Sequence, residues 1–253
     1  AIAVGQTATA ANNNSISIGT KTASRGDNAI GIGAYAESTA ARGTAIGVLS
    51  QANGAGSFAG GASAQATGEN SVAIGGAMDG NFGNKAGTAA KATGNNSIAL
   101  GTQSKAAGNN SIAQGTASNA AGNNSIAQGN SATAKQAADV AVGHAATADG
   151  TSTGADGDGV VGANNAGSAM AIGTNAQATG IVATAIGQRS KALANGAVAL
   201  GGDAKAKKGS AVAIGRGSVA DGISASAFGP AAQATGKYSV ALGVQSQATS
   251  EQA

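Results

Sequence analysis

The chain repeats a short motif every 14 residues, and this period constrains its fold more than any other feature. The motif reads Ser-Ile-Ala-Leu-Gly at residues 97–101 and returns as Ser-Ile-Ala-Gln-Gly at 111–115 and 125–129. A fixed period of this kind is typical of a solenoid, in which each unit is one turn that cannot fold alone. Positions within a unit are numbered below from its motif glycine, which is position 0.

The period is broken at two places. Motif glycines follow one another in steps of 14 within three runs, Gly5 to Gly75, Gly87 to Gly143 and Gly173 to Gly243. The steps between the runs are 12 and 30, so we expect register breaks near residues 76–86 and 151–168. Each break is expected to be a loop insertion or an interruption of the solenoid.

A 14-residue period also equals two heptads, so a coiled coil is the first alternative. Besides the motif glycine, many units carry a second glycine at position +7, such as Gly94 and Gly108. Each glycine costs about 1 kcal/mol inside a helix. The glycine spacing therefore excludes a coiled coil.

Period-two alternation predicts two short strands in each unit. Positions −3 and −1 are mostly Ile, Val or Leu, and position −2 between them is Ala with few exceptions, such as Ser17 and Gly31. Positions +3 and +5 are small, and position +4 is usually polar. This is the pattern of an all-β roll with two glycine-rich bends per turn. We expect the aliphatic residues to face the interior, opposite the small residues at +3 and +5.

Unusual residues are interpreted on the same assumption. Phe58 shares its strand face with Gly60, as if a bulky ring displaced its neighbour. Gln114 and Gln128 stand at position −1 and are expected to form a buried amide ladder. The Asn-Asn-Ser segments at the bends are expected to stack as side-chain ladders.

The alanines at position −2 would then point outward and form a flat seam against another copy of the chain. An outward row facing water would normally be polar, so we expect these alanines to lie at an interface between copies. The expected interface residues are Ala73, Ala99, Ala113, Ala127, Ala171, Ala185, Ala199, Ala213 and Ala241.

Composition and charge argue against several function classes. The 253 residues include no cysteine, one histidine (His144) and 2% aromatic residues, with a net charge of +3. This charge and the lack of stacking aromatics argue against nucleic-acid binding. Neither a catalytic arrangement nor a cofactor or metal site is expected. The single Gly154–Gly159 segment resembles fragments of calcium-binding repeats, but we expect a loop there.

One group of basic residues is a candidate partner-binding surface. Lys191 and Lys205 share position +4 in adjacent units, so we expect their side chains to stack and to attract an anionic partner. A solvated face is the simpler alternative. The group consists of Arg189, Lys191, Lys205, Lys207, Lys208 and Arg216.

The repeated pattern N-S-[IV]-A-[IL]-G followed by x-x-[AS]-x-A resembles the head repeat of the YadA-like trimeric autotransporter adhesins. The resemblance covers almost the whole chain. It implies a left-handed parallel β-roll, association into a homotrimer, and display on the bacterial cell surface by an outer-membrane anchor. It also implies binding to host cells, extracellular-matrix proteins or other surfaces, and cell–cell aggregation.

We therefore expect one head domain over residues 1–253, with no stalk or membrane anchor in this chain. An ice- or surface-binding β-solenoid is the alternative, although its flat ladder of one residue type does not match the mixed residues at position +4. A left-handed β-helix acyltransferase would need a six-residue period and an intersubunit histidine, and the sequence indicates neither.

Overall fold

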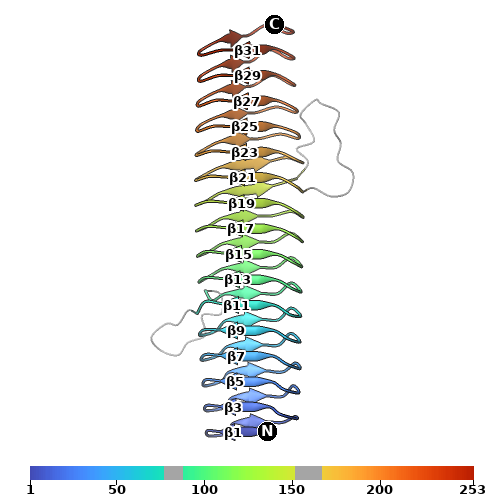
Figure 1. The fold of residues 1–253 in the computed structure, drawn as a ribbon, viewed down its shortest axis with the longest axis vertical. Helices are drawn as coiled ribbons and strands as arrows, with labels where there is room; N and C mark the ends of the chain where they lie inside the picture. Colours follow the sequence, from blue (N-terminus) through green and yellow to red (C-terminus); the bar gives the residue numbers. More distant parts are fainter. Residues whose placement is uncertain (77–87, 152–166) are drawn as a thin grey trace. The chain divides into compact units, whose positions relative to one another are not determined.

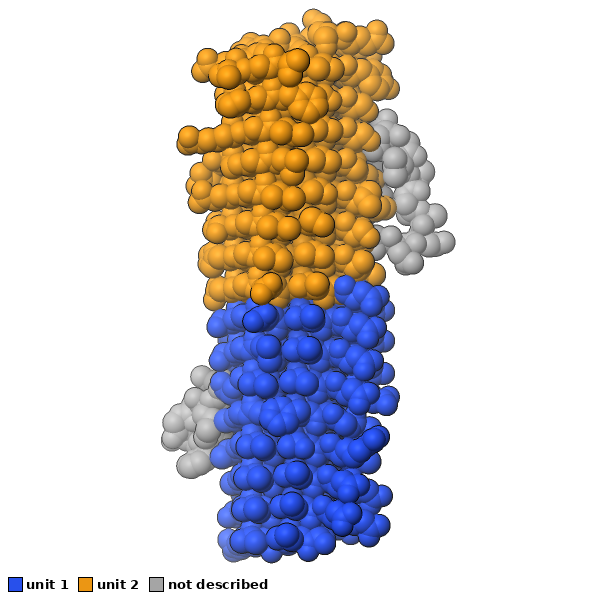
Figure 2. Space-filling model, in the orientation of Figure 1, with its two compact units in different colours: residues 1–124 blue, residues 125–253 orange. Residues whose placement is uncertain are grey.

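The structure is a computed structural model that describes residues 1–76, 88–151 and 167–253. Among these residues every regular element is a short β-strand. The chain divides into two compact units, residues 1–124 and 125–253, which are coloured separately in Figure 2. Each unit contains eight turns, and each turn supplies one strand to each of two parallel sheets.

In unit 1, sheet A is built from the strands at positions −3 to −1 and sheet B from those at +4 and +5. The strands of sheet A are β1 (Ile2–Val4), β3 (Ile16–Ile18), β5 (Ile30–Ile32), β7 (Thr44–Ile46), β9 (Phe58–Gly60), β11 (Val72–Ile74), β13 (Ile98–Leu100) and β15 (Ile112–Gln114). Those of sheet B are β2 (Thr9–Ala10), β4 (Ala23–Ser24), β6 (Glu37–Ser38), β8 (Gln51–Ala52), β10 (Gln65–Ala66), β12 (Lys91–Ala92), β14 (Lys105–Ala106) and β16 (Asn119–Ala120).

Unit 2 repeats this arrangement. Its sheet A contains β17 (Ile126–Gln128), β19 (Val140–Val142), β21 (Met170–Ile172), β23 (Thr184–Ile186), β25 (Val198–Leu200), β27 (Val212–Ile214), β29 (Ser226–Phe228) and β31 (Val240–Leu242). Its sheet B contains β18 (Thr133–Ala134), β20 (Thr147–Asp149), β22 (Gln177–Thr179), β24 (Lys191–Ala192), β26 (Lys205–Ala206), β28 (Val219–Ala220), β30 (Gln233–Ala234) and β32 (Gln247–Ala248).

Within each unit every strand pairs with its counterpart in the next turn, in parallel and without a shift in position. In unit 1, Ile98 pairs with Ile112 and Ala99 with Ala113. Figure 1 shows the strands of sheet A following one another turn by turn. The predicted all-β parallel solenoid with 14-residue turns is confirmed.

The two glycine columns exist because successive bends stack backbone on backbone. The motif glycine Gly101 has a φ of 120°, and a Cβ there would lie 2.9 Å from the carbonyl carbon of Gly115. At position +7, a Cβ on Gly94 would lie 2.0 Å from the carbonyl oxygen of Gly108. The residue at position −5 is left-handed, as Asn96 is with a φ of 54°, which suits the short polar side chain of asparagine.

Serine hydroxyls and asparagine ladders stabilise the bends. Ser97 donates a hydrogen bond to the carbonyl of Gly94 at 2.6 Å, and Ser104 donates to that of Gly101 at the same distance. The predicted asparagine ladder is confirmed in unit 1, where the backbone N–H of Asn95 donates to Oδ1 of Asn109 at 2.9 Å. These bonds give the bends polar partners within the chain and between adjacent turns.

The prediction of which face of sheet A points inward is wrong. In strand after strand the middle residue is buried, and the first and third residues are half-buried or exposed. The interior is therefore formed by the small residues at −2, which pack against the buried small residues at +3 and +5. The inward orientation predicted for positions +3 and +5 is confirmed, as Ala64 and Ala66 show with 0% exposure.

The alanines expected at an interface between copies consequently lie inside the roll. Eight of the nine have an exposed fraction of 0% and the ninth, Ala241, one of 2%, so they have almost no surface to offer a partner. Aliphatic side chains would not fit in their place because the two sheets are too close together. The residues concerned are Ala73, Ala99, Ala113, Ala127, Ala171, Ala185, Ala199, Ala213 and Ala241.

The break near residues 76–86 is an insertion within one turn. Val72 pairs directly with Ile98, which is 26 residues away, so 26 − 14 = 12 extra residues lie between the two strands. Thr88 takes position +1, because its carbonyl accepts from the N–H of Gln103 at 2.8 Å as position +1 does in regular turns. Gly87 therefore does not complete a turn of its own, and the sixteen turns are one fewer than the motif glycines suggested.

The second break is also an insertion, at the other bend. Val140 pairs with Met170, 30 residues away, which leaves 30 − 14 = 16 extra residues. The chain resumes its normal place at Gly167, which forms a bridge with Ala137. The Gly154–Gly159 segment and residues 77–87 lie outside the described residues.

A buried carboxylate joins the two ends of this second insertion. Asp139 occupies position −4, where many turns have serine, and is completely buried. Its Oδ2 accepts from the N–H of Gln136 at 2.8 Å and from that of Gly150 at 3.1 Å. Its Oδ1 accepts from the N–H of Ala169 at 2.9 Å. Asp139 therefore connects the residues on both sides of the inserted segment.

Candidate functional site on the outer faces

The outer face of sheet A carries a row of exposed apolar side chains in each unit. We call the first and third residues of every sheet A strand the aliphatic stripe. Ile18, Ile32, Ile46 and Ile74 of the stripe in unit 1 have exposed fractions between 37% and 45%. In unit 2, Ile186 and Ile214 have exposed fractions of 37% and 36%. A contiguous apolar surface of this kind is typical of an interaction site.

Phe58 and Gly60 belong to this stripe and show how its residues share space. A Cβ on Gly60 would lie 2.9 Å from Cε1 of Phe58, so the phenyl ring covers the place where a side chain would be. The predicted pairing of a bulky residue with a small one on the same face is confirmed. Their face is the outer one, however, and not the interior.

Gln114 and Gln128 also belong to the stripe, at the ends of β15 and β17. Both side chains are exposed on the outer face, so the predicted burial of these amides inside the roll is wrong. Neither glutamine is without an interaction partner in the chain. Their neighbours at position −1 are apolar, Leu100 in unit 1 and Val142 in unit 2.

The predicted basic group lies on the outer surface of unit 2, and part of it is ion-paired. Arg189 binds Asp203 of the next turn through two hydrogen bonds of 2.7 and 2.8 Å. Lys207 contacts Asp221 at 2.6 Å. The structure places Lys191 beside Lys205 in adjacent strands of sheet B, as expected.

Electrostatics around Asp203 reflect this surrounding positive charge. Hydrogen bonds from Arg189 lower the pKa of Asp203 below its usual value, partial desolvation opposes the shift, and the nearby positive charges lower it further. The same hydrogen bonds raise the pKa of Arg189. Within the described part of the chain, Lys191, Lys205, Lys208 and Arg216 form no ion pair, so their charges are available to a partner.

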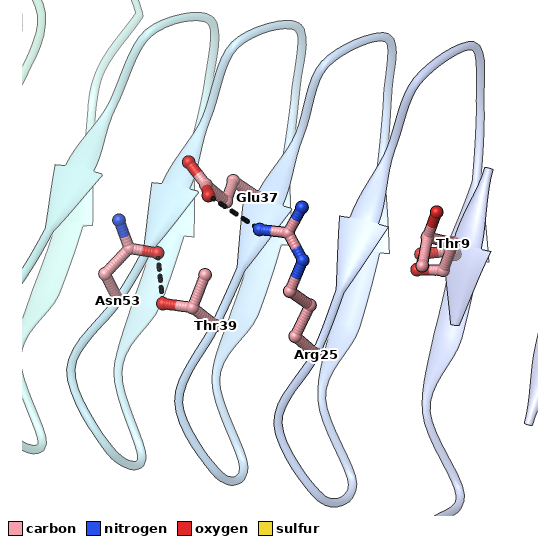
Figure 3. A network of polar contacts seen from close by, with 6 residues as sticks. Thr9, Arg25, Glu37, Thr39 and Asn53 are labelled. Atoms are coloured by element: carbon pink, nitrogen blue, oxygen red, sulfur yellow. Dashed lines mark hydrogen bonds and ion pairs between the residues drawn. The ribbon is translucent and has the colours of Figure 1, made fainter. Parts of the chain in front are cut away.

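Unit 1 has similar contacts between successive turns, shown in Figure 3. Nη1 of Arg25 lies 3.4 Å from Oε1 of Glu37, and Thr39 donates to Oδ1 of Asn53 at 2.9 Å. These exposed pairs run parallel to the ladder of strands. Each contributes little stability in water, so the outer face of sheet B is a hydrated polar surface.

Sequence reasoning missed an apolar groove at one bend of unit 1. The groove is lined by Thr20, Ala34, Tyr35, Val48 and Leu49, all at positions +1 and +2. The signal was present in the sequence, because Tyr35 and Leu49 replace the small or polar residues that other units have at +2.

Other kinds of site find little support. Across the described ranges no three potential metal-ligating side chains come together, and His144 belongs to no such group. No helix in the described part of the structure has the length and apolar character needed to cross a bilayer.

The fold and its outer faces define a structural repeat protein rather than a catalytic one. The family model for the YadA head domain repeat matches residues 1–22, 24–50, 52–77, 86–104, 106–132, 120–144, 165–190, 178–204, 192–218, 206–232, 220–246 and 234–253. The chain therefore belongs to the YadA head family, which forms the head domains of trimeric autotransporter adhesins. No curated protein shows a significant match to the chain.

Proposed function

We propose that this chain forms the head of a bacterial surface adhesin, in which three copies assemble through the aliphatic stripe. The observation that carries this proposal is the outward orientation of the stripe in both units, with isoleucine side chains more than one third exposed. Family membership suggests three copies, a left-handed roll and a single head domain over residues 1–253.

The stripe is suited to a second copy of the same chain. Its side chains repeat at the spacing of parallel strands, about 4.8 Å. Another copy has the same spacing, so its side chains can fit between those of the first along many turns. Burying an exposed aliphatic side chain stabilises an assembly by about 1.5–3 kcal/mol, so many rungs together favour association strongly.

The remaining outer surface is proposed to bind host cells, extracellular-matrix proteins or other surfaces and to promote aggregation of bacterial cells. Weak contacts repeated along three chains and over many copies would give strong attachment through multivalency. The basic group of unit 2 favours acidic partners. The head would be displayed at the cell surface through an outer-membrane anchor outside this chain.

The mass of the purified chain in solution tests the assembly. A trimer has a mass of 3 × 23.3 = 69.9 kDa, measurable by light scattering. The double variant Ile186→Glu and Ile214→Glu places charges in the stripe and should lower the mass toward that of one chain. The matched control, Gln177→Glu and Gln233→Glu, changes outward residues of sheet B and should leave the mass unchanged. A wild-type mass of one chain would rule out this assembly.

Binding to immobilised collagens, fibronectin, laminin and whole cells tests the adhesive function. The wild-type chain should bind at least one of these surfaces better than the stripe variant, because a dissociated chain loses multivalency. Equal weak binding of both proteins to every surface would contradict the proposal.

A further inference from the structure

We infer that Gln114 and Gln128 set the alignment of the copies along the aliphatic stripe. This inference rests on the proposed assembly through that stripe. The two glutamines are long polar side chains on an otherwise largely apolar face, and both are exposed in the single chain. A copy in register brings the amides of all copies to the same level.

The stripe needs such a device because its repeat makes misalignment easy. Successive turns of unit 1 present the same residue at position −1, as Ile18, Ile32 and Ile46 show. A copy displaced by one turn would bring isoleucine against isoleucine again and lose only the contacts of one end turn. Apolar contact alone therefore discriminates poorly between registers.

The glutamines remove this ambiguity. A primary amide has both donors and acceptors, so amides at one level can hydrogen-bond to each other. Displacement by one turn would place Gln114 against Leu100 of another copy, or Gln128 against Val142. A buried amide facing an aliphatic side chain loses hydrogen bonds to water without replacement, which is unfavourable.

Other polar residues of the stripe are less suited to this role. Thr44 and Thr184 stand at position −3 and are half-buried. A threonine hydroxyl is short and can bond to nearby backbone, so it tolerates an apolar neighbour more easily. A longer polar side chain in an apolar seam is known to specify register at a cost in stability.

Two changes of opposite sign are therefore expected when both glutamines are replaced. The variant Gln114→Leu and Gln128→Val introduces the residue types found at position −1 in the neighbouring turns, so the roll should fold normally. The midpoint of thermal dissociation should rise because more apolar surface is buried. Alignment should become mixed because nothing opposes displacement by one turn.

Cysteine scanning measures the alignment, since the chain has no cysteine of its own. Two differently tagged chains are co-expressed, one with Leu100→Cys and the other with a cysteine at Ile18, Ile46, Ile74 or Leu100. Disulfide yield after mild oxidation is then plotted against position. With both glutamines present, a single maximum is expected. In the double variant a second maximum should appear one turn away, at least tenfold above the wild-type yield at that position.

The matched control changes apolar residues of the same two strands, Ile112→Leu and Ile126→Leu, and should keep the single maximum. One maximum in the glutamine double variant, or two in the wild type, would overturn the role of the glutamines while leaving the assembly intact. A wild-type chain that forms no disulfide at any position and has the mass of one chain would overturn the assembly itself.

Discussion

The hydroxyl oxygens of Ser17 in β3 and Ser24 in β4 lie 3.0 Å apart and are hydrogen-bonded across the interior of the roll. Ser17 also contacts the carbonyl of Thr9 on the opposite sheet at 2.7 Å. The two sheets are therefore separated by little more than a pair of one-carbon side chains. This thinness explains why alanine, serine and glycine fill the interior and why larger apolar residues lie outside.

Enlarging an interior residue should consequently unfold the roll. Ala199→Leu adds three carbon atoms to a position with no exposed surface. We expect a loss of about 3 kcal/mol or more in the free energy of unfolding, at the upper end of overpacking effects. The control Gln177→Leu lies on the outer face and should change the free energy little. Denaturant unfolding followed by circular dichroism measures both, and equal stability of the two variants would contradict a thin interior.

The glycine at position +7 should be equally sensitive to a single methyl group. In Gly94→Ala the added Cβ meets the carbonyl oxygen of Gly108, and the turns must move apart. By contrast, a Cβ on Gly202 meets only the carbonyl oxygen of Gln188, at 3.9 Å. We expect Gly94→Ala to lower the melting temperature and Gly202→Ala to leave it unchanged or raise it slightly, since alanine restricts the unfolded chain. A harmless Gly94→Ala would show that the stacking is looser than described.

Loss of the Asp139 carboxylate should loosen the turn around the second insertion. Asp139→Ser introduces the residue that many turns have at this position but leaves backbone N–H groups of Gly150 and Ala169 without their acceptor. We expect a loss of about 1–3 kcal/mol, the range for an unsatisfied buried donor, and faster hydrogen exchange of these two amides. Ser111→Ala, at the same position in a turn without an insertion, serves as the control and should leave both amides protected. Unchanged exchange in Asp139→Ser would argue against the clamp.

Charge reversal in the basic group should weaken attachment to acidic surfaces. The variant Lys191→Glu and Lys205→Glu changes two stacked charges of unit 2, and the salt concentration needed to elute it from a sulfated resin should fall. The control Lys91→Glu and Lys105→Glu makes the same change at the same positions of unit 1, where the lysines also pair. Similar elution of the two variants would mean that net charge, and not this group, controls attachment.

The pair of Arg189 and Asp203 makes a prediction about pH. Because the folded-state pKa of Asp203 is lowered, the favourable contribution of its carboxylate is present above the unfolded-state pKa, about 3.9. This contribution is lost as the pH falls through the lower folded-state value. In Arg189→Gln the pKa of Asp203, followed by carboxyl NMR, should move up toward the usual value. An unchanged pKa would show that Arg189 does not cause the shift.

Periodicity carried most of the fold, and the orientation of one sheet escaped it. The 14-residue repeat predicted the strands, the bends and the small inward residues of sheet B. Alternation of isoleucine and alanine in sheet A, as at Ile98 and Ala99, distinguishes two faces but does not say which one is inside. That choice depends on the distance between the sheets, which the bends determine. The small residues already assigned to the inner face of sheet B were the available clue.

The interface residues were misplaced for the same reason. The argument that an outward row must meet another copy was sound in form, but it was applied to alanines such as Ala199 instead of their aliphatic neighbours Val198 and Leu200. Gly87 shows a second limit. It has the spacing of a motif glycine, yet only pairing between Val72 and Ile98 reveals that it belongs to an insertion. Local patterns cannot report such pairings.

Each rung rests on the equivalent residues of the rung before it, as Ile98 does on Ile112. Gaining or losing a 14-residue block would thus alter the number of rungs and nothing in their cross-section. Near-identical neighbouring repeats in a gene recombine readily out of step. A bacterial lineage could adjust how far such a head reaches from the cell through that simple genetic event, while every surviving contact stays as it was.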